Sequence, residues 1–196
     1  AWPQVSLHVQ ATNANIDVWH GGVDLALRVR APLAPLPREE TLRPLALSPH
    51  VLVAAPALLT NAAPPASPHE LARLPTLALG NSPEESEWQL RGPTGQHASV
   101  PLAPRFVVDD MGALLCAALA GAGCAALPRL LAHPALASGA LQEVLPGWAP
   151  PPGQVQAAYA TRHGMRPAAR QLLDALAEGF EGLIAQGLCL QAHSEN

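Results

Sequence analysis

The fold of this chain is decided by residues 17–28, which read Asp17-Val18-Trp19-His20-Gly21-Gly22-Val23-Asp24-Leu25-Ala26-Leu27-Arg28. From Val23 to Val29 every second side chain is apolar, and a period of two is typical of a β-strand. Gly21 and Gly22 stand just before this run. Glycine ends helices because it adopts a positive φ without a Cβ clash. The stretch therefore predicts the end of a short helix, a glycine turn and a buried strand over 23–29.

Length and composition limit the class of protein. The chain has 196 residues, 49% of them hydrophobic, which suits one domain or two small lobes. No stretch approaches the roughly 20 apolar residues that cross a bilayer, and no signal peptide is visible. The net charge is −4 and the eleven basic residues, all arginine, form no run, so the clustered basic face that DNA binding requires is not expected. Three irregularly spaced cysteines suit a reducing compartment and predict a cytoplasmic protein.

Strand and helix patterns alternate along the chain, which predicts an α/β fold with mostly parallel sheets. The expected strands cover residues 5–9, 23–29, 45–55, 74–79, 102–108, 124–127, 141–145 and 155–160. The expected helices cover 12–20, 111–120 and 130–137, and a last helix begins at Pro167. A further helix start is predicted at 67–70, where Ser67 is the N-cap and Glu70 closes a capping box. Residues 111–120 are apolar almost all round, which predicts a fully buried helix.

Residues 17–28 resemble the "D-L-x-x-x-G-x-D-l-a-l-R" segment of the effector-binding domain of LysR-type transcriptional regulators. Five further segments are similar to that domain, in the same order and across nearly the whole chain. They are residues 42–59 ("r-x-L … l-V-A-s-P-a-y-L"), 64–71 ("P-x-x-P-x-d-L"), 108–128 ("v-n-D … a-A-l-a-G-x-G-i-a-x-l-P"), 139–146 ("G-x-L-v-x-v-L-p") and 159–176 ("v-Y … P-x-v-r-a-f-l-D-f-l"). Two positions depart from the pattern, since Asp109 replaces a common asparagine and Cys124 a β-branched residue.

The resemblance implies two Rossmann-like lobes joined by two crossover strands, as in type 2 periplasmic binding proteins. Lobe I would be residues 1–52 plus 154–196, lobe II residues 53–153, and the crossings would lie near 51–55 and 155–160. Family members place a winged helix-turn-helix, a linker helix, a strand and a helix before the segment that matches Trp2-Pro3-Gln4-Val5. We therefore expect that the first strand and helix of lobe I are missing from this sequence.

Ligands of open α/β sheets bind outside the carboxyl ends of strands, where helix N-termini present free N–H groups. The resemblance places a small effector in the cleft between the lobes. Helix dipoles and an arginine at these positions suit an organic anion. The expected effector-binding residues are Thr12, Asn13, Arg28, Val29, Gly80, Asn81, Ser82, Val108 and Asp109. Simpler roles stay open for some of them: Thr12 and Asn13 as helix caps, and Arg28 as a partner of Asp17 or Asp24. Asp110 is expected to be a helix cap.

The chemistry of an enzyme is not evident. The eight histidines show no metal-ligand spacing, and the sequence lacks a G-x-S-x-G elbow, a dinucleotide fingerprint and a P-loop. Glu84, Glu85 and Glu87 stand in a polar stretch before Trp88 and are interpreted as solvated surface. Cys116 and Cys124 are expected to pack in the core, although one family member senses peroxide through a cysteine pair in this half of the domain. We expect no catalysis, cofactor or metal.

The sequence thus predicts the ligand-sensing and oligomerising domain of a LysR-type regulator. Expected partners are a small-molecule effector, further copies of the chain in a homodimer or tetramer, and DNA only through the absent N-terminal domain. RNA polymerase is a candidate partner of the full-length protein, and no membrane is expected. Helices near 13–20 and 113–120 are candidates for the pairing surface, the second also for plain core. The alternatives are a periplasmic solute-binding protein of a transporter and an enzyme on the same scaffold.

Overall fold

The computed structural model describes residues 5–12, 18, 22–30, 40–60, 64–80, 87–160 and 165–192. The chain forms two compact units: unit 1 comprises Ala1–Leu47 with Gln154–Asn196, and unit 2 comprises Ser48–Gly153. The chain therefore passes from one unit to the other after Leu47 and again after Gly153. The two crossings predicted from the sequence, near 51–55 and 155–160, lie shortly after these two passages, the first inside unit 2 and the second inside unit 1.

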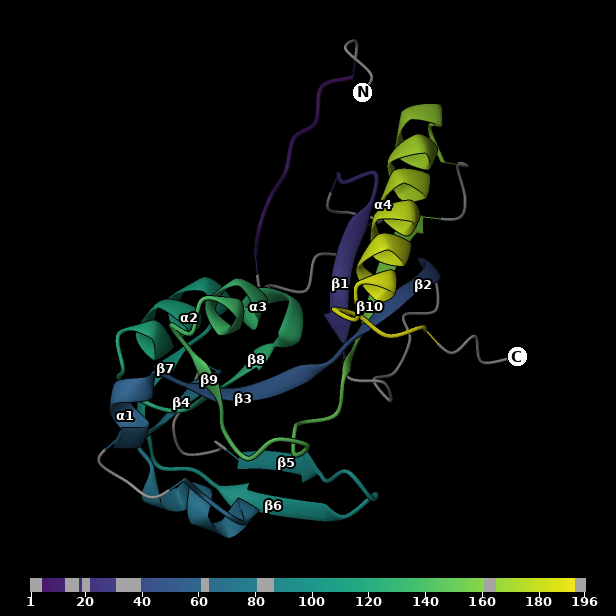
Figure 1. Cartoon of the computed structure of the whole chain (residues 1–196). Helices are drawn as coiled ribbons and strands as arrows, with labels where there is room; N and C mark the ends of the chain where they lie inside the picture. Colours follow the sequence, from purple (N-terminus) through teal and green to yellow (C-terminus); the bar gives the residue numbers. More distant parts are fainter. Residues whose placement is uncertain are drawn as a thin grey trace. The chain divides into compact units, whose positions relative to one another are not determined.

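Unit 1 is built around a sheet of three strands with the order β1-β10-β2 (Figure 1). These strands are β1 (Ala26–Arg30), β2 (Glu40–Ser48) and β10 (Gly153–Ala160). β1 runs antiparallel to β10, with Arg28 opposite Gln156. The last helix, α4 (Pro167–Ala185), begins at proline, whose fixed φ suits the first helical turn, as the sequence predicts.

Side-chain ion pairs connect α4 and the residue before it to the rest of unit 1. Arg43 of β2 lies 3.1 Å from Asp174 of α4, and Arg166 lies 3.5 Å from Asp24. These four side chains are largely exposed, so each pair contributes at most about 1 kcal/mol. The position of α4 therefore depends mainly on the apolar stripe that includes the buried Ala169 and Leu173.

Two sequence predictions for unit 1 are corrected, and a third is not tested. Residues 5–9 form no strand, and their apolar side chains Val5, Leu7 and Val9 are 47%, 63% and 74% exposed. The strand predicted from Val23 begins only at Ala26, after Gly22 with its φ of +68° and a bend at Asp24. The helix predicted over 12–20 falls mainly outside the described residues.

Unit 2 contains seven strands and four short helical segments among the residues that are described. The strands are β3 (His50–Ala54), β4 (Thr76–Leu79), β5 (Glu87–Arg91), β6 (His97–Pro101), β7 (Pro104–Val108), β8 (Ala125–Pro128) and β9 (Gln142–Glu143), together with the first residue of β10. The helices are α1 (Pro56–Thr60), the 3-10 helix η1 (Pro68–Arg73), α2 (Met111–Leu119) and α3 (Arg129–Ala137).

The prediction of mostly parallel sheets is wrong for the strand pairs that the structure describes. β3 pairs antiparallel with β8 and β9, and β5 pairs antiparallel with β6, whereas β4 and β7 are parallel (Figure 1). The order of elements along a sequence does not fix direction, because a long connection can return a strand in either sense. The α/β class itself is confirmed.

β3 lies between the two hydrophobic cores of unit 2. Val51 and Val53 belong to one core, with Leu77, Leu114, Leu127 and Leu141. Leu52 and Ala54 belong to the other, with Leu71, Trp88, Leu90 and Val100. Successive side chains of a strand point to opposite faces, so β3 supplies both cores at once.

The hairpin of β5 and β6 was not predicted. Trp88 and Leu90 are buried while the side chains between and beside them are exposed, which is the period-two pattern of a strand. The acidic stretch was interpreted as loop surface; residues 84–86 lie outside the described part, and Glu87 is the first residue of β5. The alternation in 87–91 and the turn residues at 92–95 were the signal that could have identified this hairpin.

Two helix predictions for unit 2 are also corrected. α2 is not fully buried: Leu114 and Ala118 are buried, but Cys116 and Leu119 are exposed. At 67–70 the helix starts as expected with Pro68, but it is a 3-10 helix and the Ser67 side chain makes no cap. The Glu70 carboxylate instead accepts a hydrogen bond from the Ala66 N–H at 3.1 Å. No helix in the described ranges has the length and apolar character needed to cross a membrane.

Gly123, between α2 and β8, provides a test of how closely this turn packs against β4 and the residue before it. A Cβ at this position would lie 2.8 Å from the Pro75 carbonyl oxygen and 3.0 Å from the Leu77 side chain. Gly123→Ala should therefore lower the free energy of unfolding by about 1–3 kcal/mol, as measured by urea denaturation. The matched control is Gly182→Ala in α4, where a Cβ meets nothing within 4 Å. That substitution should raise stability by up to about 1 kcal/mol, since alanine favours helices. Equal stability of the two variants would contradict the packing described.

Candidate functional site

The carboxyl ends of β4 and β7 form one edge in unit 2. Leu79 lies opposite Val108 in the parallel register, and the Gly80 N–H donates a 3.0 Å hydrogen bond to the Val108 carbonyl oxygen. Three predicted site residues, Gly80, Val108 and Asp109, are thereby brought together. Parallel strands present their carboxyl ends at the same edge, where α/β sheets bind ligands.

The helix that follows this edge is capped by its own sequence. Asp110 has extended backbone angles and its Oδ1 accepts the Ala113 N–H at 2.7 Å, so it is the N-cap of α2 as expected. This side chain is therefore engaged in capping. Asp109 makes interactions of its own and is exposed.

A hollow of about 220 Å³ lies next to the same edge, and we call it the β4 hollow. Leu79 and Met111, two of its lining residues, are the immediate neighbours of Gly80 and Asp110 in the chain. The walls are mainly apolar, and His50 and Glu87 contribute ionisable groups. The full lining is His50, Leu77, Ala78, Leu79, Glu87, Trp88, Leu102, Met111, Ala126 and Pro150.

His50 is the first residue of β3, and its Nδ1 is buried without a hydrogen-bond partner among the described residues. Burial lowers the pKa of His50 below its ordinary value of 6.5, and the backbone carbonyl of Pro151 acts in the opposite direction. The ring is therefore neutral at pH 7 and offers either a donor or an acceptor.

Glu87 is held by its neighbours on the β5–β6 hairpin. Its carboxylate accepts a 2.7 Å hydrogen bond from Gln89 Nε2 and a further hydrogen bond from the Ser99 hydroxyl. These contacts fix the negative charge beside the β4 hollow. No arginine or lysine lines the hollow among the described residues, so the hollow does not favour an anion.

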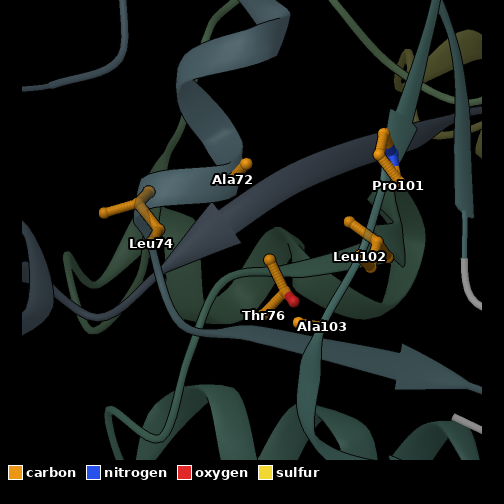
Figure 2. A pocket seen from close by; sticks show the side chains of 6 residues that line it. All are labelled: Ala72, Leu74, Thr76, Pro101, Leu102 and Ala103. Atoms are coloured by element: carbon orange, nitrogen blue, oxygen red, sulfur yellow. The ribbon is translucent and has the colours of Figure 1, made fainter.

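A second hollow of about 220 Å³ lies between η1 and the segment after β6. Figure 2 shows Ala72 and Leu74 on one side and Pro101 and Leu102 on the other, with Thr76 between them. Thr76 is the only lining residue with a polar side chain. This hollow therefore offers little to orient a ligand.

In unit 1 the predicted residues do not gather in the same way. Thr12 lies in a segment without regular structure, and Val29 is exposed on β1. Arg28 forms a bidentate pair with Glu40, whose oxygens lie 2.5 and 3.1 Å from its Nη1 and Nη2. The sequence did not suggest this partner. Asn13, Asn81 and Ser82 lie outside the described residues, as does Asp17.

The arginine–glutamate pair is largely removed from solvent, with the two side chains 12% and 5% exposed. A charge pair buried to this degree is held by its own hydrogen bonds. The positive charge of Arg28, which was expected to attract an anionic effector, is therefore already balanced by Glu40.

The cysteines differ from one another. Cys124 is buried, and burial raises the pKa of its thiol to about 12, so the reactive thiolate is scarce at neutral pH. This agrees with core packing. Cys116 is exposed on α2, so the expectation of core packing is wrong for it. Within the described ranges, no three His, Cys, Asp or Glu side chains gather as a metal site requires.

The fold is that of an α/β domain made of two units. Residues 1–181 match the family model of the LysR substrate binding domain, and the chain belongs to this family. Its curated relatives are transcriptional regulators, which excludes the alternative of a transporter's solute-binding protein.

Two such relatives illustrate the similarity. The chain is 29% identical over 147 residues to the probable HTH-type regulator LtrA of Klebsiella pneumoniae, covering 75% of this chain and 46% of the relative. It is 28% identical over 179 residues to PtxR of Pseudomonas aeruginosa, covering 90% and 55% respectively. The chain thus spans about half the length of the curated relatives it matches.

Solved structures confirm the fold. Full-length AphB, a virulence activator of Vibrio cholerae, superposes with a TM-score of 0.77 at 21% identity, covering 91% of this chain and 59% of that one. The CrgA regulatory domain of Neisseria meningitidis gives a TM-score of 0.72 at 23% identity, covering 86% and 81%. The two-lobed α/β architecture implied by the resemblance is therefore confirmed at the level of the fold family.

The environment of His50 makes stability depend on pH. The unfolded chain binds a proton at His50 near pH 6.5, whereas the folded chain binds it only at lower pH. Stability should therefore fall as the pH drops below about 6.5. Urea denaturation between pH 5 and 8 should show a smaller fall for His50→Phe. His133→Phe, at an exposed position of α3, should keep the wild-type profile. A His50→Phe profile that matches wild type would contradict the role of His50 in this pH dependence.

Proposed function

We propose that this chain is the part of a LysR-type regulator that binds a small effector and self-associates. The observation that carries the proposal is the edge at which Gly80, Val108 and Asp109 meet beside the β4 hollow. This edge is built as ligand-binding edges of α/β sheets are built. The arrangement supports sensing, and we propose that the domain carries out no bond-making chemistry.

The proposed effector contacts in unit 2 are Gly80, Val108 and Asp109, together with Asn81 and Ser82. In unit 1 they are Thr12, Asn13, Arg28 and Val29. An anionic group is proposed for unit 1, where the neighbouring Arg30 has a buried Nη1 without a hydrogen-bond partner among the described residues. A buried guanidinium nitrogen gains free energy from an oxygen acceptor.

The effector would act through a difference in its affinity for alternative arrangements of the domain, since only such a difference shifts a population. We propose that the shift reaches a DNA-binding domain in the full-length cytoplasmic protein, with RNA polymerase as a further partner. These steps rest on membership in the family.

Ligand-induced stabilisation tests the effector proposal. A metabolite at a hundred times its Kd should stabilise the folded chain by about 2.7 kcal/mol, visible as a rise in Tm. Val108→Lys should abolish the rise, because a charge would enter the proposed edge. His97→Lys, at an exposed position of β6, should keep it. A collection of small organic acids and neutral metabolites that never shifts the Tm would count against the proposal.

The exposed face of α2 is the proposed pairing surface. Cys116 and Leu119 on α2 and Leu130 on α3 are apolar and exposed, and dimers bury such surface. Sedimentation velocity should show a dimer for the wild-type chain. Leu119→Glu should weaken association at least about tenfold, which corresponds to about 1.4 kcal/mol. Gln171→Glu introduces the same charge at an exposed position of α4 and should leave the dimer intact. A wild-type monomer at high concentration would refute self-association.

A further inference from the structure

We propose that the β4 hollow binds an uncharged, ring-sized apolar group that carries one hydrogen-bond donor, and that His50 accepts this hydrogen bond. The inference rests on the proposed function in one respect: the group would belong to the effector. It deepens that function by naming the chemical class that unit 2 selects.

The size of the hollow sets the size of the group. A dry cavity of about 150 Å³ holds a benzene molecule. The β4 hollow, at about 220 Å³, accommodates one ring with a small substituent.

The walls of the hollow select an apolar group. Leu77, Leu79 and Met111 come from β4 and α2, Ala126 comes from β8, and Trp88 comes from β5. These residues are spread over four elements of unit 2, so the hollow is formed by the tertiary fold and not by one loop. Trp88 also offers an aromatic surface, against which a ring packs well.

One polar atom in the lining lacks a partner. Among the described residues that line the hollow, His50 alone has a buried side-chain atom without a hydrogen bond, its Nδ1. A buried polar atom of this kind is rare in native proteins and indicates a missing partner. The neutral ring accepts a hydrogen bond at an unprotonated nitrogen, so a hydroxyl or N–H group on the ligand satisfies it.

The charge at the hollow disfavours an anionic ligand. Glu87 contributes a negative charge, held in place by Gln89 and Ser99, and no cationic arginine faces it from the lining. A carboxylate inside the hollow would meet this charge without compensation. An uncharged donor group does not meet that repulsion.

Three probes test these requirements on the 196-residue chain: phenol, which carries a donor, toluene, which lacks one, and benzoate, which is anionic. Binding is followed by isothermal titration and by the indole N–H signal of Trp88 in NMR spectra. Phenol and toluene should both shift the Trp88 signal, and benzoate should shift it least. Benzoate binding there more tightly than phenol, or no shift with phenol, would overturn the inference.

The contribution of the hydrogen bond is measured by comparing two ligands, with and without a donor, on the wild-type chain and on a His50 variant. The ratio of phenol affinity to toluene affinity should fall about fivefold from wild type to His50→Phe, as a neutral hydrogen bond predicts. His50→Leu serves as a second variant in case phenylalanine fills the space. Toluene should still bind to at least one of the two variants. An unchanged ratio in both variants would overturn the role of His50.

Substitutions that fill one of the two hollows with a larger side chain show where the probe binds. Ala126→Leu, in the lining, should abolish binding of both phenol and toluene, whereas Ala103→Leu, in the hollow of Figure 2, should not. Failure of Ala126→Leu to reduce binding would overturn the location, provided that its circular dichroism matches wild type.

Self-association is measured separately. A chain that dimerises but does not bind phenol therefore contradicts this inference alone. A chain that binds phenol but stays monomeric contradicts only the pairing part of the proposed function.

Discussion

The structure of unit 2 depends on the burial of β3 on both faces. Val51 to Ala54 are at most 2% exposed, and alternate side chains enter two separate hydrophobic cores. A fully buried valine or leucine side chain contributes about 1.5–3 kcal/mol. Because one strand supplies both cores, displacing it would disturb the α2 side and the hairpin side together. The β4 hollow lies between elements that this strand holds in place, and His50 is the strand's first residue.

The candidate site follows from the parallel pairing of β4 with β7. That pairing brings two carboxyl ends to one edge, and the chain leaves it on one side through Gly80 and on the other through Asp109 and Asp110. Asp110 then starts α2 by accepting the Ala113 N–H. The edge, the helix cap and the β4 hollow thus follow from one strand pair and one helix start. They bring backbone N–H groups, a carboxylate and apolar side chains together around the same edge.

The sequence was informative where neighbouring residues decide the structure. Pro167 at a helix start, Asp110 as a cap and the strands around Val51, Leu77 and Ala125 depend on local backbone preferences, and the structure has them. Residues 87–91 alternate between apolar and polar, which predicts a strand, but the neighbouring glutamates led to an interpretation as loop. Strand direction and the exposure of α2 were not readable, because both depend on elements distant in the sequence. An apolar helix can face solvent or a partner as well as a core.

The same contrast applies to the predicted site residues: position after a strand could be predicted from the sequence, but the partner of a charged or polar side chain could not. Gly80, Val108 and Asp109 were identified from their position after strands, and the fold brings them together. Arg28 was selected for its charge, but a charge acts on a ligand only if no residue of the chain balances it, and Glu40 does so. His50 had no sequence signal, since its significance comes from burial beside residues of β4, β5 and α2. If His50 accepts the proposed hydrogen bond, ligand selectivity in this domain depends less on the number of charged residues than on which polar atoms the fold leaves unsatisfied. In unit 2 that criterion favours a neutral donor, whereas helix dipoles and an arginine had suggested an anion.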